Sequence, residues 1–141
     1  MSQQDAITSV KRFWEAVAAR DFETCARHLA DNVVRIGPRQ MEDDTIEGRE
    51  AYLEFLVRVI SAMPGYRNVT HDLTASPDGS RVYIQCTEWS SPGSGSAQEV
   101  EVPLCMVCDL DAAAKITKID IYWKTPTTSV DWTLADQVLA D

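Results

Sequence analysis

Basic side chains and long apolar runs are both scarce in this sequence, and each shortage excludes a class of function. Only 13 lysines and arginines stand against 22 aspartates and glutamates, which gives a net charge of −9. Such a field repels phosphate backbones and anionic lipids, and no basic stripe overrides it. No apolar run approaches the ~20 residues of a bilayer span. We therefore expect neither nucleic acid nor membrane as a partner.

The chain also lacks an N-terminal signal and a convincing metal motif. No basic region followed by an apolar region opens the sequence, so it predicts a cytoplasmic protein with reduced cysteines. Cys105 and Cys108 form a CxxC, but the motif lies in a strand-like run, where residues i and i+3 face opposite sides. The cysteines are typical of small buried hydrophobes. The sequence therefore predicts no metal site and no cofactor.

The first half of the sequence has the apolar periodicity of helices, and the second half has that of strands. Helices are expected over residues 4–19 with a capping box at Ser2 and Asp5, after the N-cap Asp21, and between Gly48 and Pro64. Strands are expected at 32–38, 66–76, 81–90, 98–110 and 115–124, with a flexible hairpin loop at 91–96. This order predicts one α+β domain over residues 1–141, with an antiparallel sheet and an amphipathic tail at 126–141.

Three short motifs carry a resemblance to a known family. The order of elements, with Asp21-Phe-Glu23, Ile46-Glu-Gly-Arg-Glu50 and Lys115-Ile…Tyr122-Trp123, resembles the nuclear transport factor 2-like superfamily over residues 5–125. It is similar to the branch that contains ketosteroid isomerase and the SnoaL-like polyketide cyclases. The resemblance implies a cone-shaped curved sheet wrapped around three helices, an apolar pocket at the open end, and a homodimer formed through the outer sheet face.

The residues that ketosteroid isomerase needs are missing from this sequence. That enzyme uses a tyrosine, a carboxylate base and a protonated acid. The resemblance places these roles at Phe13, Gly37 and Met106, none of which can take a proton or stabilise an enolate. Limonene epoxide hydrolases are similar in fold and need an arginine between two carboxylates. The corresponding strand offers Glu99 and Glu101 without one, so neither mechanism is expected.

The resemblance implies a pocket wall made by the inward faces of helices and strands. Its expected members are Phe13, Val17, Tyr52, Phe55, Val59, Leu104, Met106, Ile119, Ile121 and Trp123. The strand at 82–89 is harder to orient, because both of its faces are half apolar. Aligning Trp89 with an aromatic residue of the family favours an inward face that contains Tyr83, Gln85 and Trp89. The competing interpretation is that all these side chains simply fill a core.

Two side chains are candidates for a general base. His71 alternates with Val69 and Leu73 and is expected to face inward, although a structural role competes with a catalytic one. Asp120 is similar in position to the buried aspartate of SnoaL-like cyclases. Its parity, opposite Ile119, instead favours an ion pair or a dimer contact on the outer face. The acidic run 42–44 is typical of a solvated loop or a lid at the mouth of the cone.

The sequence therefore predicts a protein that binds a small, largely apolar or aromatic molecule in the cone. One alternative is a cyclase-type or isomerase-type enzyme that uses His71 or Asp120 as general base. A second alternative is a protein-interaction module, which would have a filled core and an exposed apolar patch.

Overall fold

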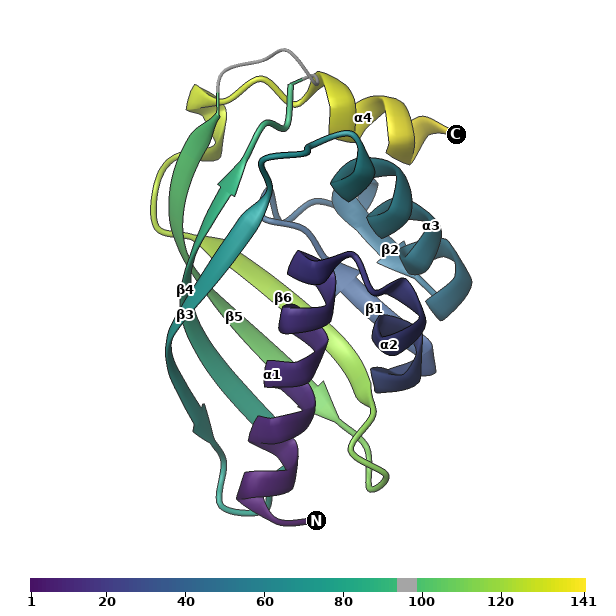
Figure 1. Cartoon of the computed structure of the whole chain (residues 1–141), viewed down its shortest axis with the longest axis vertical. Coiled ribbons are helices and arrows are strands. Elements are labelled where there is room, and N and C mark those ends of the chain that lie inside the picture. The colour runs from purple at the N-terminus through teal and green to yellow at the C-terminus, as the bar shows by residue number, and fades with distance from the viewer. Residues whose placement is uncertain (94–98) are drawn as a thin grey trace.

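A computed structural model describes residues 1–93 and 99–141, so the expected hairpin loop at 91–96 falls partly outside the described residues. Its elements are α1 (Gln3–Ala19), α2 (Phe22–His28), β1 (Leu29–Ile36), η1 (Glu42–Asp44), β2 (Thr45–Glu47), α3 (Arg49–Ser61), β3 (Arg67–Ala75), β4 (Arg81–Ser90), β5 (Val100–Leu110), β6 (Ile116–Trp123), η2 (Thr127–Ser129) and α4 (Thr133–Ala140). The predicted α+β class is confirmed (Figure 1).

The helices begin where the capping residues of the sequence predict. The Ser2 hydroxyl accepts the backbone N–H of Asp5 at 3.0 Å, and the carboxylate of Asp5 accepts the Ser2 N–H in return, which completes the capping box of α1. Asp21 caps α2 by accepting the N–H of Thr24 at 3.2 Å. These caps satisfy N–H groups that a helix cannot satisfy itself, and so they fix where each helix starts.

The sheet differs from the prediction in one pairing and one strand. Its strand order is β2-β1-β6-β5-β4-β3, and β1 pairs with β6 in parallel, whereas every other pair is antiparallel. The prediction of a purely antiparallel sheet is therefore wrong at this point. The loop after β1 also contains η1 and β2. Three-residue elements carry too little periodicity for the sequence to reveal them.

The curved sheet wraps around α1, with α2 and α3 beside it and α4 across one end (Figure 1). The end that lies near the N-terminus of α1 is filled with apolar side chains, and we call it the packed half. Its buried members include Val10, Ile84, Cys108, Ile116 and Ile119, each no more than 2% exposed. The other end, where α1, β1, β4 and β6 all finish, is covered by α3 and α4, and we call it the hollow half. The curved sheet thus encloses two different interiors.

None of the helices in the described part of the chain combines the length and the hydropathy of a membrane span. All four cysteines are unpaired thiols, and Cys105 and Cys108 lie on opposite faces of β5.

Candidate functional site

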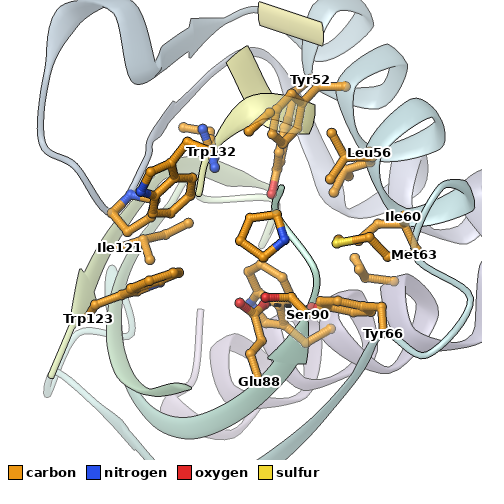
Figure 2. Close-up of a pocket in the computed structure, with 18 residues that line it drawn as sticks. Tyr52, Leu56, Ile60, Met63, Tyr66, Glu88, Ser90, Ile121, Trp123 and Trp132 are labelled. Atoms are coloured by element: carbon orange, nitrogen blue, oxygen red, sulfur yellow. Dashed lines mark hydrogen bonds between the residues drawn. The ribbon is translucent and has the colours of Figure 1, made fainter. Parts of the chain in front are cut away.

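The hollow half contains a cavity of about 90 Å³ between α3, the ends of β4 and β6, and α4 (Figure 2). Its wall consists of Trp14, Val17, Arg35, Pro38, Tyr52, Phe55, Leu56, Val59, Ile60, Met63, Tyr66, Glu88, Ser90, Pro92, Ile121, Trp123, Trp132 and Ala135. Most of these side chains are aliphatic or aromatic, and the charged ones are only Arg35 and Glu88. A mainly apolar wall with a few polar groups is the usual composition of a small-molecule site.

Two tryptophans close the cavity on the side of the C-terminal tail. The indole rings of Trp123 and Trp132 are stacked with centroids 4.8 Å apart, on the opposite side of the cavity from Ile60 and Met63 (Figure 2). The guanidinium carbon of Arg39 lies 4.6 Å from the Trp132 ring centroid, which is a cation–π contact. Trp132 Nε1 donates to the carbonyl oxygen of Thr127 at 2.8 Å. The side chain that covers the mouth is therefore held in a defined position.

Helix α4 is fixed over the mouth by charged contacts. Arg39 donates to Asp136 Oδ1 at 2.8 Å, and Arg58 on α3 forms an ion pair with the carboxylate of Asp141. These groups are partly exposed, so each pair contributes little stability and breaks at modest cost. The ion pairs of the tail therefore add little to the cost of moving it away from the mouth.

Among the residues that the structure describes, Glu88 is the one carboxyl group in the cavity wall. It extends from the inner face of β4, and its Oε2 accepts the hydroxyl of Tyr66 at 2.6 Å. Asn68 Nδ2 donates to Tyr66 Oη at 3.3 Å, which directs the phenolic proton towards Glu88. Burial among apolar side chains raises the pKa of Glu88, and the Tyr66 hydrogen bond and the charge of Arg35 oppose that rise in part. The group is suited to hold a proton or to take one.

A buried ion cluster of Arg35, Arg39 and Asp44 joins the end of β1 to the loop that follows it. Arg35 Nη1 donates to Asp44 Oδ1 at 3.2 Å and to its carbonyl oxygen at 3.1 Å, while Arg39 Nε donates to Asp44 Oδ2 at 3.3 Å. The Asp44 side chain is 1% exposed, so the expectation that the whole acidic run 42–44 is solvated is wrong for this residue. Only Glu42 and Asp43 are exposed, because two arginines draw the third carboxylate inward.

The carboxylate of Asp44 occupies the space beside Gly37 that a side chain at that position would fill. A Cβ atom at Gly37 would lie 2.3 Å from Asp44 Cγ, far inside van der Waals contact. This is the position where the resemblance to ketosteroid isomerase puts the catalytic base. Because any side chain at Gly37 would collide with Asp44, the ion cluster and a base at this position exclude each other.

The expected pocket wall divides into two groups. Val17, Tyr52, Phe55, Val59, Ile121 and Trp123 line the cavity. Phe13, Leu104, Met106 and Ile119 are 0–2% exposed and lie in the solid core beside the cavity instead, so their expected place in the pocket wall is wrong. The physical reason is that α1 packs on the concave face of the sheet, mainly against β3 and β4, and its apolar side chains fill the space there, which leaves room towards α3 and α4.

The expected inward face of β4 is also wrong. Glu88 lies opposite Val102 in the β4–β5 ladder, and directly opposed residues share a face. Since Val102 belongs to the buried face of β5, the inner residues of β4 are 82, 84, 86 and 88. Tyr83 and Gln85 are exposed on the outer face, and Trp89 stacks there under Arg67, whose guanidinium carbon is 4.5 Å from the ring centroid.

Both base candidates of the sequence lie outside the cavity. His71 falls in a register shift between Thr70 and Asp72, so the parity that predicted an inward side chain does not hold, and the residue is exposed. Its Nε2 lies 2.8 Å from Thr87 Oγ1. Asp120 accepts the Tyr122 hydroxyl at 2.6 Å and the side-chain amide of Gln40 at 2.9 Å on the opposite side of β6 from the cavity wall. Neither side chain reaches a molecule in the cavity.

The side chains that sequence reasoning missed are Arg35, Tyr66, Glu88 and Trp132. Only Glu88 left a usable signal, because it continues the apolar series 82, 84 and 86, and a lone carboxylate on a buried face is unusual. The others depend on contacts between distant segments. Arg35 and Asp44 meet through a 3₁₀ turn, and Trp132 reaches the cavity from the tail.

The curved sheet with helices on its inner face defines an α+β cone fold, and comparison with known proteins gives the family. The SnoaL-like domain matches residues 10–119, which is most of the chain. The protein therefore belongs to the SnoaL-like family, and the expected membership of the nuclear transport factor 2-like superfamily is confirmed. No curated protein matches the chain significantly.

Solved structures support the fold at low sequence identity. The epoxide hydrolase/cyclase-like enzyme SalBIII, which has a role in pyran ring formation in the polyether salinomycin, is 20% identical, with a TM-score of 0.75 over 89% of this chain and 93% of that one. An LEH-like epoxide hydrolase of M. tuberculosis is 22% identical, with a TM-score of 0.71 over 97% and 93%. A protein of unknown function with a cystatin-like fold from Methylobium petroleophilum PM1 is 12% identical, with a TM-score of 0.76 over 90% and 80%.

Proposed function

We propose that this protein binds a small, largely apolar or aromatic molecule in the cavity of the hollow half. The observation that carries the proposal is a cavity whose wall combines aromatic rings with one carboxyl group, Glu88. Three of the four tryptophans, Trp14, Trp123 and Trp132, contribute to that wall. A protein-interaction module would need a filled core instead, and the cavity argues against it.

The size of the cavity limits what enters without movement. Its volume of about 90 Å³ is smaller than the ~150 Å³ apolar cavity that is known to bind benzene. A six-membered ring therefore requires Trp132 and α4 to shift outward. The partly exposed ion pairs of α4 add little to the cost of such a shift, and the apolar contacts of Leu134, Val138 and Leu139 with the core must also give way.

Binding is testable with cyclohexanone and benzene as probes. A Trp89→Phe protein removes the tryptophan that lies outside the cavity, so its emission reports mainly on the cavity wall. We expect saturable changes in that emission and a melting temperature that rises with probe concentration, since a ligand that binds only the folded state stabilises it. The proposal would be contradicted if neither the emission nor the melting temperature changed with probe concentration, both in Trp89→Phe and in a second variant, Trp132→Ala, that widens the mouth.

A second candidate function is acid–base catalysis by Glu88, and the raised pKa of this carboxyl group favours it. In this reaction the Glu88 carboxylate takes a proton from the carbon next to a ketone carbonyl. The electron pair of that C–H bond forms a C=C bond to the carbonyl carbon, and the C=O π pair moves onto oxygen to give an enolate. The carboxyl group then returns a proton to carbon, and the C=O bond forms again. Two proteins of similar fold, the epoxide hydrolase/cyclase-like enzyme SalBIII and the LEH-like epoxide hydrolase of M. tuberculosis, are enzymes, which supports a catalytic role on this fold.

Deuterium exchange measures this proton transfer directly. Cyclohexanone in D₂O is followed by proton NMR with the wild-type protein and with Glu88→Gln. The matched control is Glu101→Gln, which removes an exposed carboxylate from the outer face of β5. We expect exchange to be faster with wild type and the control than with Glu88→Gln, by about 10²-fold, as for loss of a positioned base. Equal rates with all three proteins would exclude Glu88 as the base.

A further inference from the structure

Tyr52 presents an unpaired hydroxyl to the cavity. Its side chain on α3 is 1% exposed, and its ring lies against Phe13 with centroids 6.2 Å apart. The oxygen points into the space between Trp132 and Leu56 (Figure 2). Within residues 1–93 and 99–141, no group forms a hydrogen bond with this hydroxyl. A buried hydroxyl without a partner is uncommon in a native protein and requires an explanation.

Among the other polar groups of the wall, Trp14 Nε1 also has no hydrogen-bond partner in the described residues, whereas Tyr66 and Trp132 do have partners. Tyr66 donates to Glu88 at 2.6 Å, and Trp132 Nε1 donates to the Thr127 carbonyl at 2.8 Å. Burial raises the pKa of Tyr52 strongly, although the charge of Arg35 opposes the rise, so the hydroxyl stays protonated near neutral pH. Tyr52 is therefore a fixed hydrogen-bond donor that faces the interior of the cavity.

Arg35 supplies further donors beside Tyr52. Only Nη1 of its guanidinium is used by the described residues, in the two bonds to Asp44, so Nε and Nη2 have no acceptor among them. The ring of Phe55 lies under the guanidinium carbon at 4.6 Å and holds the group flat against the cavity wall. Arg35, Tyr52 and Glu88 all line the same cavity.

The charges around these donors favour a neutral acceptor over an anion. Asp44 already neutralises Arg35, and Glu88 would repel a carboxylate whenever it is ionised. The net charge of −9 disfavours entry of anions as well. A carbonyl or hydroxyl oxygen can accept from Tyr52 and Arg35 without these penalties.

We infer that Tyr52 and Arg35 form a subsite for a neutral acceptor oxygen, so that the ligand is an apolar ring or chain that carries a ketone, aldehyde or alcohol group. This inference rests on the proposed function and names the class of ligand that the cavity selects. The apolar wall binds the carbon skeleton, and the two donors on one side bind its oxygen. A hydrocarbon of the same shape would leave both donors unpaired.

Cyclohexanone and methylenecyclohexane test the subsite because they have nearly the same shape. The ketone has an oxygen that accepts hydrogen bonds, whereas the hydrocarbon has a CH₂ group in its place. Dissociation constants come from tryptophan emission of the wild type, of Tyr52→Phe and of Tyr83→Phe, which loses an exposed hydroxyl outside the cavity. We expect the wild type and Tyr83→Phe to prefer the ketone. In Tyr52→Phe the affinity for the ketone falls about tenfold, equivalent to about 1.4 kcal/mol, and the affinity for the hydrocarbon does not fall.

A second measurement needs no ligand. Because the Tyr52 hydroxyl has no partner, Tyr52→Phe is expected to leave the melting temperature unchanged or to raise it, whereas Tyr66→Phe lowers it by taking the donor away from Glu88. Equal affinity of the wild type for both probes, or an equal loss of both in Tyr52→Phe, would overturn the subsite and leave binding itself intact. Binding of neither probe would instead overturn the proposed function. A melting temperature that falls as far in Tyr52→Phe as in Tyr66→Phe would also overturn the subsite.

Discussion

The packed half and the hollow half share the strands β4 and β6. At one end these strands contribute to the solid core, and at the other end they line the cavity. Early in β6, Ile119 is fully buried and surrounded by other side chains, whereas Ile121, two residues later on the same face, borders the cavity. Along β4, Ile84 fills the core and Glu88 brings a carboxyl group into the cavity wall. One alternating pattern therefore builds a solid core and a cavity wall in succession.

The two halves are also held together by different forces. The packed half depends on apolar contacts, which are non-directional and tolerate no voids. The hollow half depends on α3, on the tryptophan stack and on the cluster of Arg35, Asp44 and Arg39. Buried charges of this kind keep a wall in place without filling the space beside it. We therefore expect substitutions in the two halves to affect stability to different extents.

The largest expected effect comes from the ion cluster. Asp44→Ala leaves two arginines beside an uncompensated buried site, and loss of one partner of a buried pair costs about 3–5 kcal/mol of unfolding free energy. Urea denaturation measures this loss. The control is Asp43→Ala, which removes an exposed neighbour and is expected to change the free energy by less than about 0.5 kcal/mol. Similar values for the two variants would mean that the cluster does not hold the hollow half.

A pair of isoleucines compares the two interiors directly. Ile119→Ala creates a void in the packed half and is expected to cost about 2–5 kcal/mol. Ile121→Ala removes the same atoms from a side chain that already faces the cavity, so fewer contacts are lost and the cost is expected near or below the lower end of that range. Equal losses in urea denaturation would contradict the distinction between the halves.

Trp132 at the mouth and Trp89 on the outer face form a matched pair, because each has an arginine about 4.5 Å from its ring centroid. Comparing variants of the two tests whether the mouth controls entry. Trp132→Ala removes the ring that covers the cavity and is expected to raise the association rate of benzene several-fold, because entry no longer waits for α4 to move. Trp89→Ala removes a ring of the outer face and is expected to leave the rate unchanged. Stopped-flow fluorescence measures both, and an equal change would show that Trp132 is not the barrier.

The sequence predicted the packed half better than the hollow half, and the reason is physical. Apolar periodicity in α1 and β5 follows from burial of one face, so the boundaries and the buried residues of these elements were readable. The parallel pairing of β1 with β6 joins segments about 85 residues apart and leaves no local pattern.

The residues of the cavity were harder to recognise, because their roles depend on register and on distant contacts. Glu88 was placed outward because a single strand with two half-apolar faces does not reveal its orientation; the ladder with β5 decides it. The bulge at His71 reversed the expected direction of that side chain. Trp132 was recognised only as part of an amphipathic tail, since its contact with Trp123 exists only after the chain folds.

The smallest expected effect is a pH dependence that belongs to the hollow half alone. Burial raises the pKa of Glu88, so the neutral form is favoured in the fold. The stability associated with that neutral form is complete below the unfolded pKa of about 4.3 and is lost as pH rises through the raised folded value. Glu88→Gln is always neutral and should therefore gain a few degrees in melting temperature over wild type between about pH 4 and pH 8.

A matched variant in the same experiment is Glu101→Gln on the outer face. Its melting temperature relative to wild type is expected to stay constant over the same pH range. A constant difference for Glu88→Gln as well would indicate that the carboxyl group is hydrated and ionised normally in the folded protein.

The central claim is that the hollow half is a ligand site with its own donors, and a crystal structure with cyclohexanone tests it most directly. The account predicts the ring between Trp123 and Met63, with the ketone oxygen about 2.7 Å from Tyr52 Oη. A crystal saturated with the ketone whose cavity contains only water, or the ketone bound elsewhere on the protein, would contradict it.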